Sequence, residues 1–412
     1  PMMFALEASR PASPRALPSR FVEPTPELRR RYGDRFERMG AFLGRGDPLA
    51  DAAAQALANL PEEQREATLE AALRRGSARA KDAPAEVRAL LAEAEHVPLW
   101  LDPSRADRGG AVLLGSGWFG GAVLALRSLV LGYCSPAGNK PLVFSGRLRQ
   151  DAPRRLAETS RFVQAVSMPG GMALGADGFA ITVRVRLMHA KVRTLLRRSP
   201  RWDTAAWGEP INQVDMAGTI LLFSLVLLDG LRAFGLRIPA ADAEDLLHLW
   251  RYVGVVIGVD PELLPTGEAS ARELWDLVTG SQAPPDADAR ALAAALLETP
   301  LAQARTAEQR KKAEGMVRVS YTLSRFLLGD EAADALGYPR YRAGRLLAAL
   351  PLALGPAHDA LRRTPFGAHW LAAAGHRHWA NVVEQSLAGR PATFAMPEVV
   401  AAGGAAAKPP RP

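Results

Sequence analysis

Cysteine is almost absent from this chain. Its 412 residues include one, Cys134, and a single thiol excludes an intramolecular disulfide framework. It also excludes the C-x-x-C-H motif that attaches haem covalently. The cysteine count therefore requires neither an oxidising nor a reducing compartment, and any haem must be bound without a covalent bond.

The common metal and nucleotide motifs are also missing. The seven histidines form no H-E-x-x-H pair and no repeated E-x-x-H pair of the di-iron bundles. His376 and His378 are two residues apart, which places them on opposite sides of a helix. There is no G-x-S-x-G elbow and no glycine-rich nucleotide loop, which argues against an α/β-hydrolase and a Rossmann-type NAD or flavin enzyme.

The net charge of +8 does not come with a nucleic-acid signature. Arginines are spread among acidic residues, as in 66–80 and 301–325, and no zinc-finger or RNA-binding motif accompanies them. A solvated surface explains this pattern better than a nucleic-acid site. We therefore expect no nucleic-acid partner.

Residues 111–133 form the only run that raises the question of a membrane span. Arg127 near its centre and several glycines argue against a spanning helix. We expect instead a buried, glycine-bearing helix close to a cofactor or to another helix, and no transmembrane segment. The N-terminal residues lack the apolar stretch of a signal peptide, so we expect a soluble protein, cytoplasmic if the chain is complete and extracellular if a signal was trimmed.

The composition favours an all-α fold. The chain is 48% hydrophobic and rich in alanine, leucine and arginine, and apolar residues recur at three- and four-residue steps. We expect a large multi-helix single domain over residues 26–390, with a flexible arm at 1–25 and a disordered tail at 391–412. The helices are expected at about 26–44, 48–75, 84–96, 111–133, 146–167, around His189, and at about 212–234 and 240–259, with a loop at 98–110.

One histidine lies on the apolar face of a strongly helical run. Val185, His189, Val192 and Leu196 follow at steps of four, three and four, so they share one stripe, with Arg186 and Arg193 beside His189. A neutral imidazole in a dry pocket could bind a metal or haem iron, while the guanidinium groups hold propionates or order an ion-pair network. The alternative is a hydrogen-bonded core histidine with two surface arginines.

A second cluster lies on the helix expected at 146–167. Arg155, Thr159, Phe162 and Val166 fall on one row, so a charge, a hydroxyl and an aromatic ring face the same side. The alternative is an ordinary amphipathic helix that carries a threonine by chance.

These motifs together resemble a known family over about residues 146–264. The chain is similar to the haem-dependent oxygenases of the latex-clearing protein (rubber oxygenase) and MpaB type. The motifs that carry the resemblance are Arg155 with Thr159, the R-x-x-H-x-x-x-R element of Arg186, His189 and Arg193, the W-G-E-P-I-N turn at 207–212, and L-W-R-Y-V-G at 249–254 with Gly258.

The resemblance implies a globin-like helical core that binds a non-covalent haem b. It implies that His189 is the proximal iron ligand, that Arg186 and Arg193 support the cofactor, and that the helix bearing Arg155 and Thr159 covers the distal face, where O2 binds. It further implies a hydrophobic, isoprenoid substrate, and we expect a monomer. His248, on the helix at 240–259, could touch the haem edge, but we favour a packing role.

The sequence departs from the rubber oxygenase pattern at one position. The best-known members have a lysine before the threonine, where this chain has Glu158. That carboxylate could act as a general base on an allylic carbon, or pair with Arg154 or Arg161. In the upstream loop, where some relatives use a glutamate, the chain has Asn139 and Lys140. The departures weaken the inference of polyisoprene cleavage more than that of haem oxygenase chemistry.

The sequence thus predicts an enzyme, a b-type haem oxygenase that uses O2 to cleave C=C bonds in a polyisoprene-like substrate. Its predicted catalytic residues are Arg155, Glu158 and Thr159. The alternatives are a haem mono-oxygenase or peroxidase-like oxidase of a small lipid or polyketide, and a haem-binding helical protein without turnover.

Overall fold

The computed structural model describes residues 16–144, 152–341 and 344–387, and in these ranges every regular element is a helix. This confirms the all-α prediction. The elements in chain order are α1 (Pro26–Tyr32), α2 (Arg35–Gly40), η1 (Ala41–Gly44), α3 (Pro48–Ala58), α4 (Glu62–Arg75), α5 (Ala85–Ala94), α6 (Pro103–Gly115), α7 (Trp118–Val123), η2 (Leu124–Ser128), α8 (Leu129–Tyr133), α9 (Lys140–Val143), α10 (Ala152–Ser167), α11 (Asp177–Arg198), α12 (Thr204–Trp207), α13 (Gln213–Phe223), α14 (Leu225–Ala233), α15 (Ala240–Val256), η3 (Pro261–Leu263), α16 (Glu268–Gly280), α17 (Ala287–Leu297), α18 (Thr299–Gln303), α19 (Ala307–Leu328), α20 (Asp330–Ala335), α21 (Gly344–Arg362) and α22 (Pro365–Leu387).

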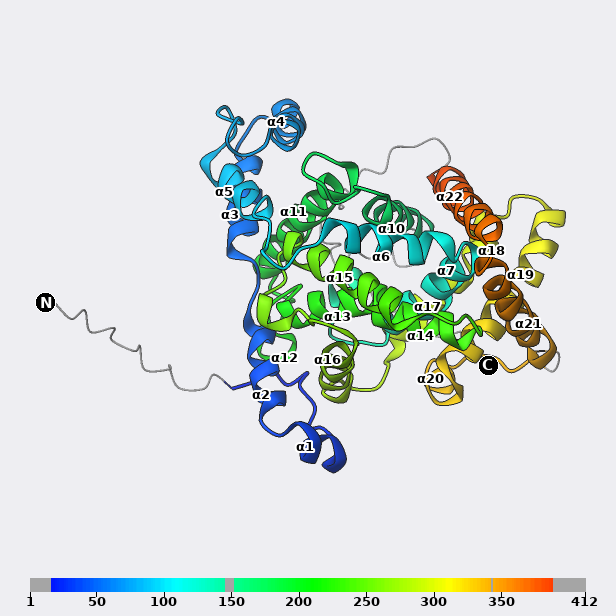
Figure 1. The fold of residues 1–412 in the computed structure, drawn as a ribbon. Coiled ribbons are helices and arrows are strands. Elements are labelled where there is room, and N and C mark those ends of the chain that lie inside the picture. Colours follow the sequence, from blue (N-terminus) through cyan, green and yellow to red (C-terminus); the bar gives the residue numbers. More distant parts are fainter. Residues whose placement is uncertain (1–15, 145–151, 342–343, 388–412) are drawn as a thin grey trace, which may run out of the picture.

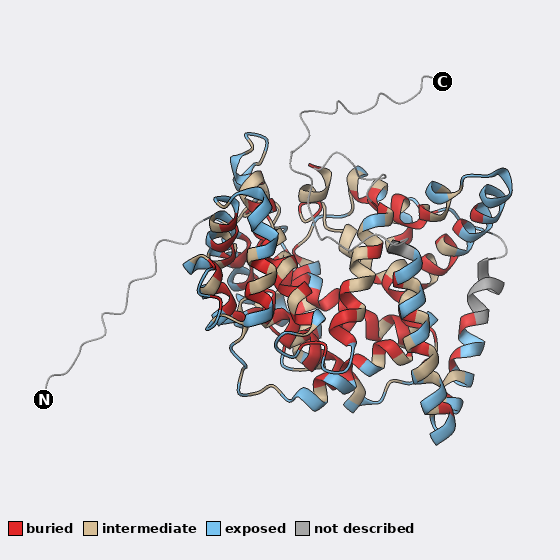
Figure 2. Ribbon diagram, turned by 90° about the horizontal axis from the view of Figure 1, so that it is seen from above, coloured by how far each residue is buried: buried red, intermediate tan, exposed pale blue. Residues whose placement is uncertain are grey.

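The helices are arranged around a central group. Helices α3, α4 and α5 lie at one end of the molecule and α19, α21 and α22 at the other, with α6, α10, α11, α13 and α15 between them (Figure 1). Buried residues are concentrated in the middle of the molecule (Figure 2). One large hydrophobic cluster joins residues from the first helices to the last, and two smaller clusters lie outside it.

Side-chain caps fix the starts of several helices. Asp47 Oδ1 accepts from the backbone N–H of Ala50 at 3.1 Å at the start of α3, and Asp102 Oδ1 accepts from Ser104 N at 2.9 Å at the start of α6. Asn212 Oδ1 accepts from Asp215 N at 3.0 Å at the start of α13. Each cap satisfies an amide that the helix itself leaves without a partner.

Four of the expected helices are broken. The helix expected at 26–44 divides into α1, α2 and η1, with α1 ending before Gly33, whose φ is 55°. The helix expected at 48–75 divides into α3 and α4 because Pro61 cannot continue a hydrogen-bonded turn. The helix expected at 212–234 divides at Ser224, whose φ of −115° and ψ of −85° are not helical. Within 111–133 the chain bends by 85° between α6 and α7, where Gly117 has a φ of 52° that favours glycine. The loop expected at 98–110 was also wrong in part, since α6 begins at Pro103.

A different segment from the expected one is long enough to span a membrane. Within the described ranges, residues 213–233 are long and apolar enough to cross a membrane, with a mean hydropathy of 1.8 over an 18-residue window. Of that window, 83% is buried inside the protein. The helical segments Pro103–Gly115 and Trp118–Tyr133, which are bent relative to each other, are long and apolar enough only if they are counted as one span. The expectation that residues 111–133 alone raise the question of a membrane span was therefore wrong.

Glycines bring α6 close to its neighbours. A Cβ atom at Gly109 would overlap the backbone of Asp245 in α15, and one at Gly110 would overlap the backbone of Ser167 at the end of α10. Glycine is therefore required here so that three helix backbones can meet. The contacts of this helix in the structure are with other helices, one of the two alternatives expected for the glycine-bearing segment.

Part of the expected N-terminal arm is ordered. The backbone of Ser19 and Arg20 donates to the carbonyls of Ala205 and Ala206 at 2.9 Å, and the Arg20 side chain, 6% exposed, pairs with Asp215. Residues 16–22 are thus fixed to the helical body, which corrects the expectation of a flexible arm over all of 1–25. The rest of that arm at 1–15 and the expected tail at 391–412 lie outside the described residues.

Candidate active site

Helix α11 presents His189 to an internal cavity. The stripe predicted from spacing is present, since Val185, Val192 and Leu196 are all less than 10% exposed and the helix packs on α3, α10 and α15. His189 itself is half-buried, and it is one of the residues that line the cavity.

The cavity is largely apolar. Its volume, counted as the space open to the centre of a water molecule, is about 260 Å³. An aromatic group forms part of the wall: Phe223 stacks on Trp250 at 5.0 Å between ring centroids, and Phe162 meets Trp250 edge-on at 5.9 Å. The lining residues are Gly138, Pro141, Leu142, Phe162, Met188, His189, Val192, Ile211, Asp215, Met216, Thr219, Ile220, Phe223, Trp250 and Ile257.

Burial keeps the His189 imidazole neutral. The pKa of His189 is lowered from 6.5 to about 4, chiefly by desolvation and also by the positive charge of Arg193, while Asp47 acts in the opposite direction. The ring atom Nδ1 is buried, and within the described part of the chain it has no hydrogen-bond partner. At neutral pH His189 therefore has a lone pair free to bind a metal ion.

Arg186 does not line the cavity and lies instead in a buried ion-pair network. Its Nε donates to Asp47 Oδ2 at 2.6 Å and its Nη2 to Glu93 Oε2 at 2.8 Å. The side chains of Arg186 and Asp47 are 3% and 5% exposed. Gly258, with a φ of 88°, leaves room for this pair, because a Cβ there would lie 2.5 Å from both Arg186 Nε and Asp47 Oδ2. Of the two roles considered for Arg186, the structure contains the ion-pair network, which fixes α11 to α3 and α5.

Arg193 holds the turn that follows α12. It is fully buried, pairs with Asp51, and donates to the carbonyls of Pro210 and Ile211 at 3.2 and 3.3 Å. Ile211, a cavity residue, has a φ of 49° and is the one non-glycine residue with positive φ in the described ranges. A β-branched residue adopts this conformation only when its surroundings enforce it. Arg193 therefore contributes to the cavity by fixing a strained part of its wall.

The three predicted catalytic residues lie on α10, one face of which reaches the cavity through Phe162. Arg155, Glu158 and Thr159 are half-buried and are not among the lining residues. Glu158 Oε1 accepts from Arg154 Nε at 3.1 Å, one of the two pairings considered for it. The part of the expected helix at 146–151 lies outside the described residues.

Neighbouring motif residues have structural partners. His248 Nε2 accepts from the backbone N–H of Asp102 at 3.0 Å, and the imidazole ring meets the Trp100 ring edge-on at 5.4 Å. His248 is not one of the residues that line the cavity, so the packing role is the one observed. Lys140 is held by Asp288 at 2.9 Å. Trp250, which follows His248 by two residues, has a buried Nε1 without a partner in the described ranges.

Sequence reasoning missed several residues that shape this site. Asp47, Asp51 and Glu93 pair with Arg186 and Arg193. Asp215 brings a carboxylate to the cavity wall, where Arg20 Nη2 contacts its Oδ1 at 2.6 Å. Partners separated by 90 to 200 residues leave no local signal in one sequence. No group of three or more potential metal-ligating side chains occurs in the described ranges.

Comparison with known proteins gives three matches. A family model for the catalytic domain of the ER-bound oxygenase mpaB/B' and rubber oxygenase matches residues 112–355. The chain is 28% identical over 184 residues to a rubber oxygenase of Streptomyces sp. (strain K30). That alignment covers 44% of this chain and 45% of the relative, so the chain matches less than half of that protein's length. A solved structure of latex clearing protein LCP in the closed state superimposes with a TM-score of 0.66 at 23% identity, over 82% of this chain and 91% of that one.

Proposed function

Because the chain belongs to the family of the mpaB/B' and rubber oxygenase catalytic domains, we propose that it is a b-type haem-dependent oxygenase that cleaves C=C bonds of a hydrophobic isoprenoid substrate. The family supports an oxidoreductase. Haem, the cleavage reaction and the isoprenoid substrate are the parts that we propose.

The observation that carries the proposal is the state of His189. It is a neutral imidazole with a buried, unpartnered ring nitrogen at the wall of an apolar cavity. A histidine without a second protein ligand suits haem, because the macrocycle itself would supply further nitrogen ligands to the iron. The indole Nε1 of Trp250 is a second buried donor without a partner on the same wall. The residues present therefore fit a haem.

When bound, the haem would supply the iron chemistry that activates O2. His189 would hold the iron. Phe162, Phe223 and Trp250 would exclude water and give flat, apolar surfaces for a substrate without polar groups. Arg186 and Arg193 would act indirectly, by fixing the helix and the turn that position His189 and Ile211.

Polar groups for the distal side would come from α10. Thr159 precedes the cavity residue Phe162 by three positions, so both lie on the same row of the helix. Arg155 belongs to that row one turn earlier. Glu158 could take a proton from an allylic carbon only after its ion pair with Arg154 is broken.

Isotope labelling tests the proposal. The purified, haem-loaded protein is incubated with an oligo-isoprene under ¹⁸O₂, and the products are analysed by mass spectrometry. Oxidative cleavage of one C=C bond by one O2 molecule gives two carbonyl groups, so each fragment is expected to carry one labelled oxygen. Label in a single uncleaved product identifies a mono-oxygenase, and a haem protein without any labelled product contradicts an enzymatic function.

The same assay tests whether Glu158 of α10 acts as the general base. If Glu158 is the base, Glu158→Gln lowers kcat by about a hundredfold, in the range of a lost general base, while Arg154→Ala leaves it unchanged or raises it. If both variants lower kcat equally, the ion pair is structural and Glu158 has no catalytic role.

A further inference from the structure

Helices α21 and α22 form a hairpin at one end of the molecule (Figure 1), and its outer surface is apolar. The exposed residues of α21 between 352 and 361 are all apolar: Leu352, Ala353, Leu354, Pro356, Ala357, Ala360 and Leu361. Phe366 and Trp370 of α22 are 78% and 49% exposed. A helix on the surface of a soluble protein normally turns polar side chains to water. A contiguous exposed apolar patch therefore indicates an interaction site.

The apolar residues of the two helices meet at the turn between them. A Cβ atom at Gly367 would lie 2.0 Å from the carbonyl oxygen of Leu361, so the end of α21 and the start of α22 are in direct contact. Phe366 precedes Gly367, and Trp370 follows Phe366 by four positions, which places both aromatic rings on one face of α22. We call the exposed large residues of this patch the hairpin surface: Leu352, Leu354, Leu361, Phe366 and Trp370.

The inner face of the hairpin is fixed to the rest of the protein. A Cβ atom at Gly355 would lie 2.4 Å from the carbonyl oxygen of Phe234, and Asp359 Oδ2 accepts from the backbone N–H of Arg237 at 2.6 Å. In α22, Trp379 is fully buried. The outer face is therefore not exposed because the hairpin stands away from the protein body.

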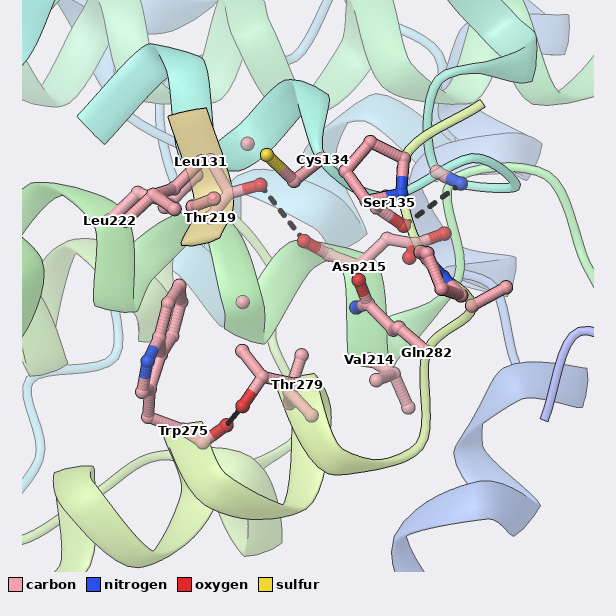
Figure 3. Close-up of a pocket in the computed structure, with 18 of the residues that line it drawn as sticks. Leu131, Cys134, Ser135, Val214, Asp215, Thr219, Leu222, Trp275, Thr279 and Gln282 are labelled. Atoms are coloured by element: carbon pink, nitrogen blue, oxygen red, sulfur yellow. Dashed lines mark hydrogen bonds between the residues drawn. The ribbon is translucent and has the colours of Figure 1, made fainter. Parts of the chain in front are cut away.

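The shape of the hairpin surface favours an extended partner. Accessible apolar side chains elsewhere, such as Leu131, Leu222 and Trp275, surround a pocket between helices (Figure 3), which can admit a small molecule. The residues of the hairpin surface lie instead on the outward faces of two neighbouring helices. Such a surface suits a broad apolar partner better than a small ligand.

The exposed charges of the hairpin have one sign. In residues 352–383, all of which the structure describes, the exposed charged side chains are those of Arg363 and Arg377. The acid in this stretch, Asp359, is 5% exposed. Exposed arginines without an exposed acid in the same stretch attract an anionic surface. Two copies of the hairpin would bring these arginines together, which disfavours a dimer through this face.

We propose that the hairpin surface docks the protein onto a lipid bilayer that contains anionic headgroups. The leucines and the two aromatic rings enter the boundary between headgroups and acyl chains, where tryptophan is favoured. Arg363 and Arg377 contact the headgroups. The hairpin lies on the membrane and does not span it. This inference goes beyond the proposed function and does not depend on it.

Co-sedimentation with vesicles tests the aromatic part of the surface. The full-length protein is mixed with vesicles of phosphatidylcholine alone or of phosphatidylcholine and phosphatidylglycerol in equal amounts, and the bound fraction is measured after centrifugation. The wild type is expected to bind the mixed vesicles more strongly. Phe366→Ser combined with Trp370→Ser should lower that binding about tenfold or more, because two exposed aromatic side chains no longer leave water. Leu99→Ser is the matched control with unchanged binding, since Leu99 is fully exposed but belongs to the loop before α6.

Removing single charges tests the arginines. Arg363→Gln and Arg377→Gln should each weaken binding to the mixed vesicles about fivefold, as the loss of one basic residue near an anionic membrane implies. Neither variant should weaken binding to phosphatidylcholine alone. Arg30→Gln in α1 is the control, because Arg30 is exposed outside the hairpin, and its binding should equal that of the wild type.

The outcomes decide between a membrane and a second copy of the chain. Unchanged binding in the double variant of Phe366 and Trp370, or no binding of the wild type to the mixed vesicles, overturns the inference. A wild-type dimer in light scattering that the double variant converts to a monomer, without vesicle binding, assigns the surface to a second copy and also overturns it. All substituted side chains are exposed, so the fold, checked by circular dichroism, should be retained. The assay needs neither haem nor O2, so its result is separate from the test of the proposed function.

Discussion

Replacing Arg186 by alanine is expected to lower the free energy of unfolding by about 3–5 kcal/mol, the range for breaking a buried ion pair. Arg186 and Asp47 are 3% and 5% exposed, so the variant leaves a buried carboxylate without its cation. Asp47 also caps α3, and the carbonyl of Val256 loses a donor at 3.3 Å. Loss of the Arg186 side chain therefore weakens the contacts of α11 with both α3 and α15.

Urea unfolding of the haem-free protein measures this effect, with Arg184→Ala as the control. Arg184 lies two residues earlier in α11 and pairs with Glu66 and Glu70, which are 73% and 41% exposed. Its loss should cost less than about 1 kcal/mol, as for surface pairs. An Arg186→Ala protein as stable as wild type but with weaker haem binding would contradict the structural role and make Arg186 a direct ligand of the haem propionates.

The second large effect concerns pH. The haem-free protein should lose on the order of 3 kcal/mol of stability through His189 as the pH falls from 6.5 to about 4. The sign follows from the lowered pKa: below pH 6.5 the unfolded chain binds a proton at this histidine, and the folded protein does not until about pH 4. Above pH 6.5 the residue is neutral in both states and contributes no pH dependence.

Urea unfolding at pH 7 and pH 5 in wild type and His189→Gln isolates this contribution. Other histidines with lowered pKa values, among them His248 and His358, act equally in both proteins, so the difference belongs to His189. The stability of His189→Gln should fall less over this interval. An identical decrease in the two proteins would mean that His189 is protonated in the folded state and cannot serve as a neutral ligand near pH 5.

The sequence predicted the faces of helices better than their ends or their partners. The stripe of Val185, His189, Val192 and Leu196 followed from spacing because the helical repeat is local and regular. The break at Ser224, whose backbone angles are not helical, did not, since no proline or glycine marks that position in the sequence. Local spacing predicts which side of a helix is buried, but not what covers it.

The charged residues of the site show the same difference between helix faces, which spacing predicts, and their partners, which it does not. Arg186 and Arg193 were correctly placed beside His189 on the helix, but their carboxylate partners Asp47 and Asp51 lie about 140 residues away. Arg20 was assigned to a flexible arm, although its side chain reaches Asp215. Such contacts depend on the tertiary fold, and no pattern in a single sequence encodes them.

The central claim is that His189 binds a haem iron, and the absorption spectrum with a pyridine haemochrome assay tests it most directly. The purified protein is compared with His189→Ala and with His358→Ala, a matched control whose half-buried imidazole also has an unpartnered Nδ1 within the described residues and which lies outside the His189 cavity. We predict a b-type Soret band in wild type and His358→Ala that is lost in His189→Ala. A wild-type protein without a Soret band after haem reconstitution, or a His189→Ala protein that keeps the wild-type spectrum, would contradict the claim.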